Sequence, residues 1–262
     1  MTCALVFDSG VGGLTIADEL RKAAPDWVVD YAADSGFFPY GVKTDEELRA
    51  RLPQLCATLV DVAKPDVLVI ACNTASTLSL ADIRAKVSVP VIGTVPAIKP
   101  AAEQTKTGVI GILATPGTVR RAYLDDLEKQ FATDKIVIRR GSAGLVDIAE
   151  RAARGQDVDQ EQVAYAVKPL FDPPDGPRID VVVLACTHFP LIRDALVTAC
   201  PNGVRLIDTG EAVARQAIRV APNTPRPARE AVAYVTGGAA NRAAMAPAFA
   251  RFGYATIEVI DV

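Results

Sequence analysis

Short runs of apolar residues, each bounded by turn residues, alternate along this chain with longer segments of helical periodicity. Several of the runs are continuous stretches of Val, Ile and Leu without polar alternation, which is typical of parallel strands buried on both faces. Alternation of such strands with helices predicts an α/β fold with mainly parallel sheets flanked by helices.

The pattern can be divided into individual elements. We predict strands at residues 4–7, 28–32, 67–71, 109–113, 136–138, 181–185, 204–207, 231–235 and 256–260. We predict helices at residues 13–23, 44–63, 75–86, 117–131, 145–153, 160–171, 191–199 and 241–252. Residues 221–229 contain three prolines and are predicted to form a loop.

Two of the predicted strands carry a similar sequence. VLVIACNTAS at 67–76 resembles VVVLACTHFP at 181–190, and LVFDSG at 5–10 pairs more weakly with GILATP at 111–116. The similar offsets suggest a duplicated α/β unit whose halves face each other, although buried Val-rich strands can also resemble each other by chance. In such sheets ligands bind beyond the carboxyl ends of the strands, where both Cys72 and Cys186 lie.

Composition limits the partners and the compartment. The net charge is −3, and no run of Lys or Arg forms a stripe, which argues against nucleic acid or an anionic membrane as partner. No apolar stretch reaches the roughly 18 residues of a membrane span, and the N-terminus does not read as a signal peptide. Five scattered cysteines fit free thiols in a reducing cytoplasm. Of these, Cys3, Cys56 and Cys200 are expected to be small buried apolar residues.

The segment ACNTAS places Cys72 between a strand and a helix. We expect Asn73 or Thr74 to cap that helix. The positive end of the helix should lower the pKa of the Cys72 thiol, and the free backbone N–H groups there can hold a carboxylate. A buried structural cysteine before a capping turn is the alternative interpretation.

His188, the only histidine in the chain, lies two residues after Cys186. A lone histidine is more often a bystander than a catalytic group. Here, however, it follows a thiol at a strand end, where an imidazole can stabilise a thiolate or carry its proton near pH 7. We therefore interpret this segment as functional.

The glycine-rich turn after the first strand begins with Asp8 and Ser9. Its spacing matches no phosphate-binding motif, and the Asp8 carboxylate would repel phosphate, so an amino group suits this turn better. Asp8 can alternatively serve only as a cap of the turn. Further along, the Pro-Tyr-Gly turn at Tyr40 and Gly41 can present backbone N–H groups and a phenol to a ligand.

Taken in order, these segments resemble the glutamate racemases, within the cofactor-independent aspartate/glutamate racemase family. The resemblance rests on FDSGVGGLT at 7–15, PYG at 39–41, ACNTAS at 71–76, PVIG at 90–93 and CTHFPL at 186–191. It implies interconversion of L- and D-glutamate, which supplies D-glutamate for peptidoglycan, without pyridoxal phosphate or any other cofactor and without a metal.

The resemblance also implies roles for individual residues. One cysteine thiolate removes the proton from the α carbon and the other thiol returns a proton on the opposite face, with Cys72 serving D-glutamate and Cys186 serving L-glutamate. Asp8 would assist Cys72, while His188 and, less securely matched, Glu150 would assist Cys186. The positions implied to bind substrate are Asp8, Ser9, Tyr40, Gly41, Asn73, Thr74, Thr187 and His188.

The family fold consists of two facing α/β domains, pseudo-two-fold related, with the active site in the cleft between them. We place the first domain at residues 1–97 plus 209–262 and the second at 98–208, inserted in the first. A homodimer is expected. The sequence departs from the family pattern at 34–38 and 94–99, which puts local pocket shape and oligomer contacts in doubt. Since no N-terminal extension is seen, we expect no activation by a cell-wall precursor.

Three alternatives remain open. The chain could be a racemase for aspartate or another acid, or a related isomerase or decarboxylase, although decarboxylases of this group keep one cysteine. Asp8, Cys72, Cys186 and His188 are of the types that bind zinc, although no C-x-x-C pair is present. A non-catalytic module that binds acidic amino acids is the third.

Overall fold

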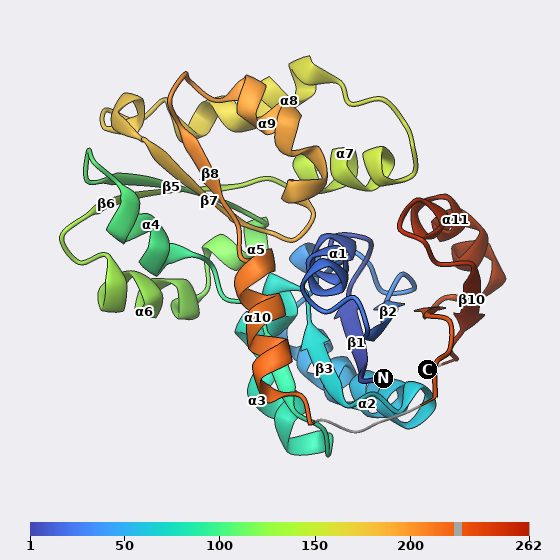
Figure 1. Cartoon of the computed structure of the whole chain (residues 1–262). Coiled ribbons are helices and arrows are strands. Elements are labelled where there is room, and N and C mark those ends of the chain that lie inside the picture. The colour runs from blue at the N-terminus through green and yellow to red at the C-terminus, as the bar shows by residue number, and fades with distance from the viewer. Residues whose placement is uncertain (223–226, 262) are drawn as a thin grey trace.

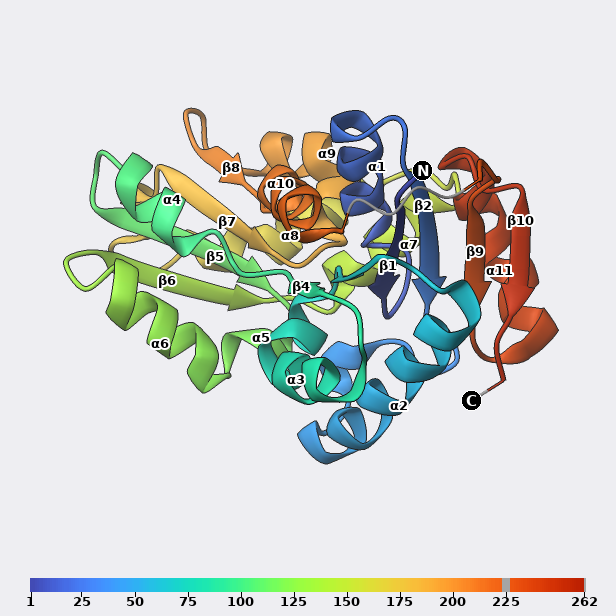
Figure 2. The same cartoon turned by 60° about the horizontal axis from the view of Figure 1, so that its bottom comes forward.

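The computed structural model describes residues 1–222 and 227–261. Its strands form two sheets, and every neighbouring pair of strands in them is parallel. The large sheet has the order β10-β9-β2-β1-β3-β4, and the small sheet has the order β6-β5-β7-β8. Figures 1 and 2 show the two sheets next to each other, with helices around each. The predicted α/β class with parallel sheets is therefore confirmed.

The strands come mostly from the predicted apolar runs. Those of the large sheet are β1 (Cys3–Asp8), β2 (Val28–Ala33), β3 (Val67–Ile70), β4 (Val91–Gly93), β9 (Val232–Val235) and β10 (Thr256–Val259). Those of the small sheet are β5 (Val109–Ala114), β6 (Ile136–Gly141), β7 (Val181–Ala185) and β8 (Arg205–Ile207).

The two sheets share one connectivity. The order β2-β1-β3-β4 in the large sheet is repeated as β6-β5-β7-β8 in the small sheet. In this correspondence β3, which leads to Cys72, matches β7, which leads to Cys186. The shared order supports the internal repeat, while the pseudo-two-fold relation and the boundaries at residues 97 and 209 stay predictions.

Helices cover both faces of each sheet. Those of the large sheet are α1 (Leu14–Ala23), α10 (Gly210–Val220) and α11 (Gly238–Arg251) on one face, with α2 (Asp45–Ala63) and α3 (Asn73–Lys86) on the other. Those of the small sheet are α7 (Gly144–Ala153), α8 (Gln160–Val167) and α9 (Arg193–Ala199) on one face, with α4 (Ile98–Gln104) and α6 (Ala122–Phe131) on the other. The short helices are α5 (Pro116–Val119), η1 (Tyr40–Val42), η2 (Lys168–Leu170), η3 (Gly176–Arg178) and η4 (Phe189–Ile192).

The central strand β1 shows why its sequence is apolar throughout. Ala4 and Val6 pack into the core on the α1 side, whereas Leu5 and Phe7 pack into the core on the α2 side. All four side chains are fully buried. Because successive side chains of a strand point to opposite faces, a strand covered on both faces needs apolar residues at every position.

Several predicted elements differ from the structure. Helix 117–131 is two helices, α5 and α6, and the last part of helix 160–171 is the separate turn η2. Among the described residues β4, α4 and α10 were not predicted, nor were the short helices η1 and η3. β4 and α4 are too short for a periodic signal, whereas α10 buries Val213, Ala214 and Ala217 at helical spacing, a pattern that the prediction overlooked. Of the predicted loop 221–229, residues 223–226 lie outside the described residues, and the flanking residues form no helix or strand.

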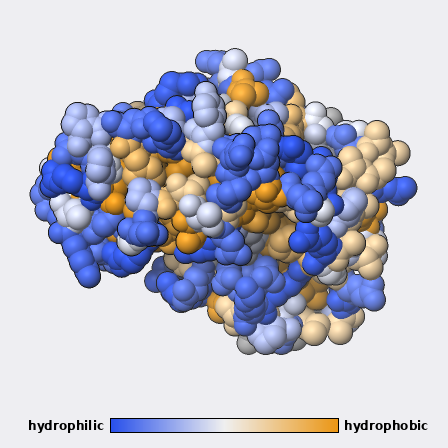
Figure 3. Space-filling model, turned by 90° about the horizontal axis from the view of Figure 1, so that it is seen from above, coloured by the Kyte–Doolittle hydropathy of each residue, from blue (hydrophilic) through white to orange (hydrophobic). Residues whose placement is uncertain are grey.

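The surface agrees with the charge pattern of the sequence. On the face shown in Figure 3, hydrophilic residues predominate, and apolar residues appear between them and along the right-hand side of the view. Within residues 1–222 and 227–261, no helix combines the length and the apolar character needed to cross a bilayer.

One buried hydrogen bond joins this core to the glycine-rich turn, and it can be tested. The hydroxyl of Tyr31 on β2 donates to the carbonyl oxygen of Gly10 at 2.8 Å, and its ring packs beside Phe249 and Tyr254. Tyr31→Phe leaves that buried oxygen without its donor and is expected to lower the free energy of unfolding by about 1–3 kcal/mol. Urea denaturation measures it, with Tyr165→Phe as the control because Tyr165 is 83% exposed. Equal stability of the two variants would contradict the prediction.

Candidate active site

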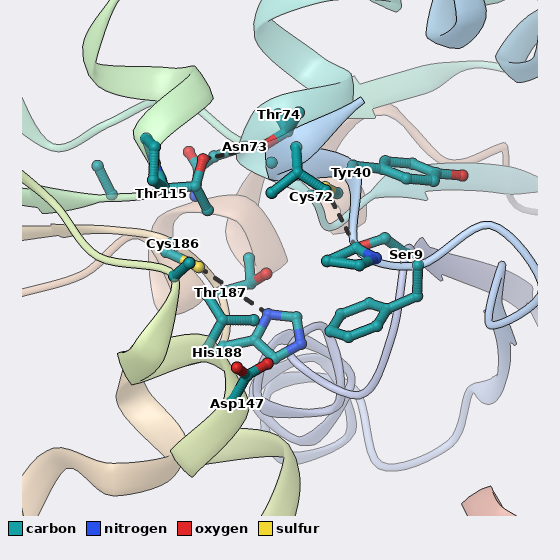
Figure 4. A pocket seen from close by; sticks show the side chains of 18 residues that line it. Ser9, Tyr40, Cys72, Asn73, Thr74, Thr115, Asp147, Cys186, Thr187 and His188 are labelled. Carbon is teal, nitrogen blue, oxygen red and sulfur yellow. Dashed lines mark hydrogen bonds between the residues drawn. The ribbon is translucent and has the colours of Figure 1, made fainter. Parts of the chain in front are cut away.

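Both cysteine motifs open onto one cavity at the carboxyl ends of β3 and β7. The cavity has a volume of about 180 Å³, and Figure 4 shows Cys72 and Cys186 reaching it from different elements. Its lining residues are Ser9, Phe38, Pro39, Tyr40, Gly41, Val42, Cys72, Asn73, Thr74, Thr115, Pro116, Ala143, Val146, Asp147, Ala185, Cys186, Thr187 and His188. Within each sheet the parallel strands place their carboxyl ends at one edge, and residues from the edges of both sheets line this cavity, so residues far apart in sequence meet here.

Cys72 lies at the start of α3, but its environment differs from the prediction. Cys72 itself occupies the cap position, Asn73 begins the helix, and neither Asn73 nor Thr74 caps it. The pKa of the Cys72 thiol is raised to about 12, chiefly by burial and then by the charge of Asp8. The backbone N–H of Ala75 and the Ser9 hydroxyl act in the opposite direction and are outweighed. The expected lowering of this pKa was therefore wrong, because desolvation exceeds the effect of the helix end.

Asp8, at the end of β1, contacts both sides of the cavity. Its Oδ1 accepts a hydrogen bond from the Ser9 hydroxyl at 3.0 Å, and the Cys72 thiol lies 3.9 Å from that same hydroxyl. Its Oδ2 accepts from the Thr187 hydroxyl at 2.8 Å. Burial raises the pKa of Asp8 despite the nearby His188 and these donors. Asp8 is thus connected to Cys72 by its charge and by hydrogen bonds through Ser9, and it is bonded directly to Thr187 of the Cys186 segment.

Cys186 contacts different residues, namely His188 and, through it, Glu150. Its sulfur lies 3.9 Å from Nδ1 of His188, and Nε2 of His188 lies 2.8 Å from Oε1 of Glu150 on α7. Glu150 also accepts from the backbone N–H of Val11 at 3.0 Å and from Arg154 at 2.8 Å. The less securely matched Glu150 is therefore in contact with the histidine.

The contacts around Cys186 determine the charge states of His188 and Glu150. Burial favours the neutral form of His188, but hydrogen bonds to Cys186 and Glu150 and the charge of Asp8 outweigh it, so the pKa of His188 is well above 6.5. Burial likewise raises the pKa of Glu150, but the His188 contact leads a set of opposing effects that leave it lowered. The pair is best described as an imidazolium beside a carboxylate.

The glycine-rich turn fits closely around this pair. A Cβ atom added to Gly12 would lie 2.4 Å from Nδ1 of His188, and one added to Gly10 would lie 2.2 Å from Oε1 of Glu150. Either distance is far below van der Waals contact. The turn after β1 therefore needs glycine at these two positions because His188 and Glu150, which belong to the small sheet's side of the molecule, lie directly against it.

Tyr40 and Gly41 line the cavity, but the Tyr40 hydroxyl is bonded within the protein and is not presented to a ligand as expected. Tyr40 is 1% exposed, and its hydroxyl donates to Oδ2 of Asp34 at 2.6 Å. The proton of the Tyr40 hydroxyl is therefore engaged in a hydrogen bond to Asp34 and is not available to donate to a ligand. Gly41 lies against Thr115, since a Cβ on Gly41 would be 3.0 Å from Cβ of Thr115.

Asn73 and Thr74 supply polar atoms on the α3 side. Asn73 is 4% exposed, and its Oδ1 finds no hydrogen-bond partner within the part of the chain that the structure describes. The Thr74 hydroxyl lies 3.4 Å from that of Thr115 and 3.3 Å from that of Thr118. An unpaired buried polar atom facing a cavity is suited to a polar ligand.

Some lining residues were not predicted. Thr115 follows β5 as Ser9 follows the equivalent β1, so the weaker internal repeat contained a signal for it. Asp147 on α7 and Phe38 also line the cavity, and the Phe38 ring centroid lies 5.8 Å from that of His188. Nothing in the local sequence of Asp147 or Phe38 indicates the site.

The arrangement offers two thiols, several hydroxyls and free amide groups to one small ligand. The lining residues include no lysine or arginine, so hydroxyls, Asn73, backbone N–H groups at the start of α3 and the His188 imidazolium are the groups available to an anionic ligand. Among the described residues no group of three or more His, Cys, Asp or Glu is placed to hold a metal ion.

Comparison with known proteins gives consistent matches. A glutamate racemase of Sphingopyxis alaskensis is 54% identical over 212 residues, covering 81% of this chain and 79% of that protein. A glutamate racemase of Salmonella enteritidis is 41% identical and covers 98% of this chain and 92% of that protein.

A solved structure is similar over the whole chain. It is the crystal structure of Escherichia coli glutamate racemase in complex with L-glutamate and the activator UDP-MurNAc-ala. It is 38% identical, with a TM-score of 0.93 over 100% of this chain and 98% of that one. The family model described as Asp/Glu/Hydantoin racemase matches residues 14–217. The chain belongs to the Asp/Glu/Hydantoin racemase family.

Proposed function

We propose that this protein interconverts L- and D-glutamate by proton transfer between two cysteines and the α carbon. The observation that carries the proposal is that Cys72 and Cys186, from equivalent strands of two sheets, line one small cavity. Inverting a stereocentre needs a base on one face and an acid on the other. Names of relatives support glutamate as the substrate, and one similar structure contains L-glutamate.

In the proposed reaction, the Cys72 thiolate takes the proton from the α carbon of D-glutamate. The resulting carbanion takes a proton from the Cys186 thiol on its other face, which gives L-glutamate and leaves Cys186 as the thiolate. The reverse reaction uses the same steps in the opposite order. Burial makes the Cys72 thiolate a strong base but a scarce one at neutral pH, since its pKa is about 12.

The neighbours of each thiol support distinct roles. Ser9 connects Cys72 to the Asp8 carboxylate, and we propose that Asp8 assists Cys72 through it. His188, held by Glu150, faces Cys186 and is placed to stabilise its thiolate. We propose that Ser9, Tyr40, Gly41, Asn73, Thr74 and Thr187 bind the substrate together with Asp8 and His188, with Tyr40 serving through its ring and backbone.

The cellular role follows from the resemblance. We propose that the enzyme acts in the cytoplasm as a homodimer and provides D-glutamate for peptidoglycan. All five cysteines lie in the part of the chain that the structure describes, where they are buried and none is joined to another by a disulfide, which is compatible with a reducing compartment.

The thiols can be tested singly. Cys72→Ser and Cys186→Ser should each lower kcat by at least about a thousandfold. A serine hydroxyl is a far weaker acid than a cysteine thiol, so it donates its proton less readily and its basic, deprotonated form is much rarer. Circular dichroism of L- and D-glutamate follows racemisation, and the unfolding temperature checks the fold. Cys200→Ser is the control, because Cys200 packs in the small-sheet core away from the cavity. Full activity of either active-site variant would refute the two-cysteine mechanism.

The substrate and the zinc alternative can be separated in one assay. Purified enzyme without added cofactor should remove the circular dichroism signal of L-glutamate and leave that of L-aspartate unchanged, with or without a chelator. Loss of signal only for aspartate would make the glutamate assignment wrong. Inactivation by the chelator together with stoichiometric zinc would support the metal site, and absence of deuterium exchange at the α carbon in D₂O would support a binding module.

The charge of His188 gives a prediction for pH. Its folded-state pKa is raised above the usual value of about 6.5, so the stability that His188 contributes is fully present just below about pH 6.5 and is lost as pH rises through the raised pKa. Because His188 is the only histidine, NMR of histidine-labelled protein reports it without overlap. The midpoint should lie above 6.5 and should fall in Glu150→Gln, while the exposed-site control Glu161→Gln leaves it unchanged. A midpoint unaffected by Glu150→Gln would refute the assigned cause.

A further inference from the structure

Asp34, directly after β2, is a buried carboxylate outside the cavity lining. It is 0% exposed and accepts four hydrogen bonds. Oδ1 accepts from Nη2 of Arg51 at 2.8 Å and from the Thr236 hydroxyl at 2.6 Å. Oδ2 accepts from Nε of Arg51 at 2.7 Å and from the Tyr40 hydroxyl at 2.6 Å. Each oxygen thus holds one nitrogen of the Arg51 fork and one hydroxyl.

Arg51, on α2, also holds the loop between Asp34 and Tyr40. Its guanidinium carbon lies 5.1 Å from the centroid of the Phe37 ring, and that ring packs edge-on against Tyr40 at 6.4 Å. The loop is further held by the Thr236 hydroxyl, which accepts from the backbone N–H of Gly36 at 2.9 Å. Residues from three parts of the chain therefore converge on one segment.

The end of this loop forms one wall of the active-site cavity, since residues 38–42 all line it. The wall in turn touches the small sheet's side of the site. A Cβ added to Gly41 would lie 3.0 Å from Cβ of Thr115, and one added to Gly117 on α5 would lie 3.0 Å from the carbonyl oxygen of Gly41. The position of Tyr40 therefore determines how closely this wall approaches α5.

We propose that Asp34 and Arg51 are positioning residues for the racemisation: their ion pair fixes Tyr40, and through Tyr40 the cavity wall at residues 38–42. This inference rests on the proposed function. Neither Asp34 nor Arg51 lines the cavity, so both act through the wall. The Tyr40 hydroxyl donates to Asp34, so the ion pair is linked to the wall through a single direct bond.

A displaced wall changes how well the substrate is held in both the ground state and the transition state. Such uniform binding appears in KM and leaves kcat largely unchanged. Arg51→Lys keeps the positive charge but loses the two-pronged geometry and the stacking on Phe37. We expect it to raise KM for D- and L-glutamate by about fivefold or more, by the same factor for both, with kcat changed less than about threefold.

The matched control is Arg49→Lys on the same helix. Arg49 pairs with Asp82 at 2.9 Å, and both side chains are exposed, so KM should not change. A second variant approaches Asp34 from the other side: Thr236→Val removes one donor without touching the cavity lining and should also raise KM, and Thr236→Ser should restore it. Racemisation is measured by circular dichroism, and the unfolding temperature is recorded for every variant.

The outcomes separate three cases. Raised KM in Arg51→Lys and Thr236→Val, with normal values in Arg49→Lys and Thr236→Ser, supports positioning. Lowered unfolding temperature with unchanged KM in both test variants overturns it, because the pair is then only structural. A wild-type enzyme that does not racemise glutamate refutes the proposed function instead. A double variant Arg51→Lys/Tyr40→Phe should be no worse than the poorer single variant, since both changes act on one contact, and full additivity would refute the route through Tyr40.

Discussion

Two hydrogen bonds between the large-sheet side and the small-sheet side of the molecule connect the two halves of the site. The hydroxyl of Thr187 donates to Asp8, and the backbone N–H of Val11 donates to Glu150. In each case a buried carboxylate from one side of the molecule accepts from the other side. Leaving such a group unpaired in a buried place costs far more than the bond contributes when made. These two bonds therefore favour the arrangement in which the two halves of the site bring their thiols to one cavity.

Much of the fold was predictable because its central strands are covered on both faces. Such strands require continuous apolar runs, and β1, β3, β5 and β7 were all located from these runs. The elements that were missed have a different basis. β4 consists of three residues, which are too few for a periodic signal. In contrast, α10 is amphipathic, with Val213, Ala214 and Ala217 buried at helical spacing, so its sequence contained a signal that the prediction overlooked.

The sequence allowed the chemical groups of the site to be identified, but not their pKa values or their hydrogen-bond partners. Cys72, Cys186 and His188 could be located because they follow strand ends in a repeat, and the structure brings them to one cavity. The raised pKa of Cys72 could not be anticipated, since it depends on burial among residues distant in sequence. Likewise, no local pattern assigns the Tyr40 proton to Asp34, because that contact is created by how the loop folds onto α2.

The two thiols have different neighbours, but thermodynamics limits how far this difference can appear in the kinetics of the two enantiomers. Cys72 faces Ser9 and Asp8, whereas Cys186 faces His188 and Glu150, so the two proton transfers of the proposed mechanism would take place in unlike surroundings. Enantiomers have equal free energies in water, and a racemase must therefore have the same kcat/KM in both directions. The asymmetry of the site can only be divided between kcat and KM, with one enantiomer bound more tightly and turned over more slowly. An unsymmetrical protein thus carries out a reaction whose equilibrium is symmetrical.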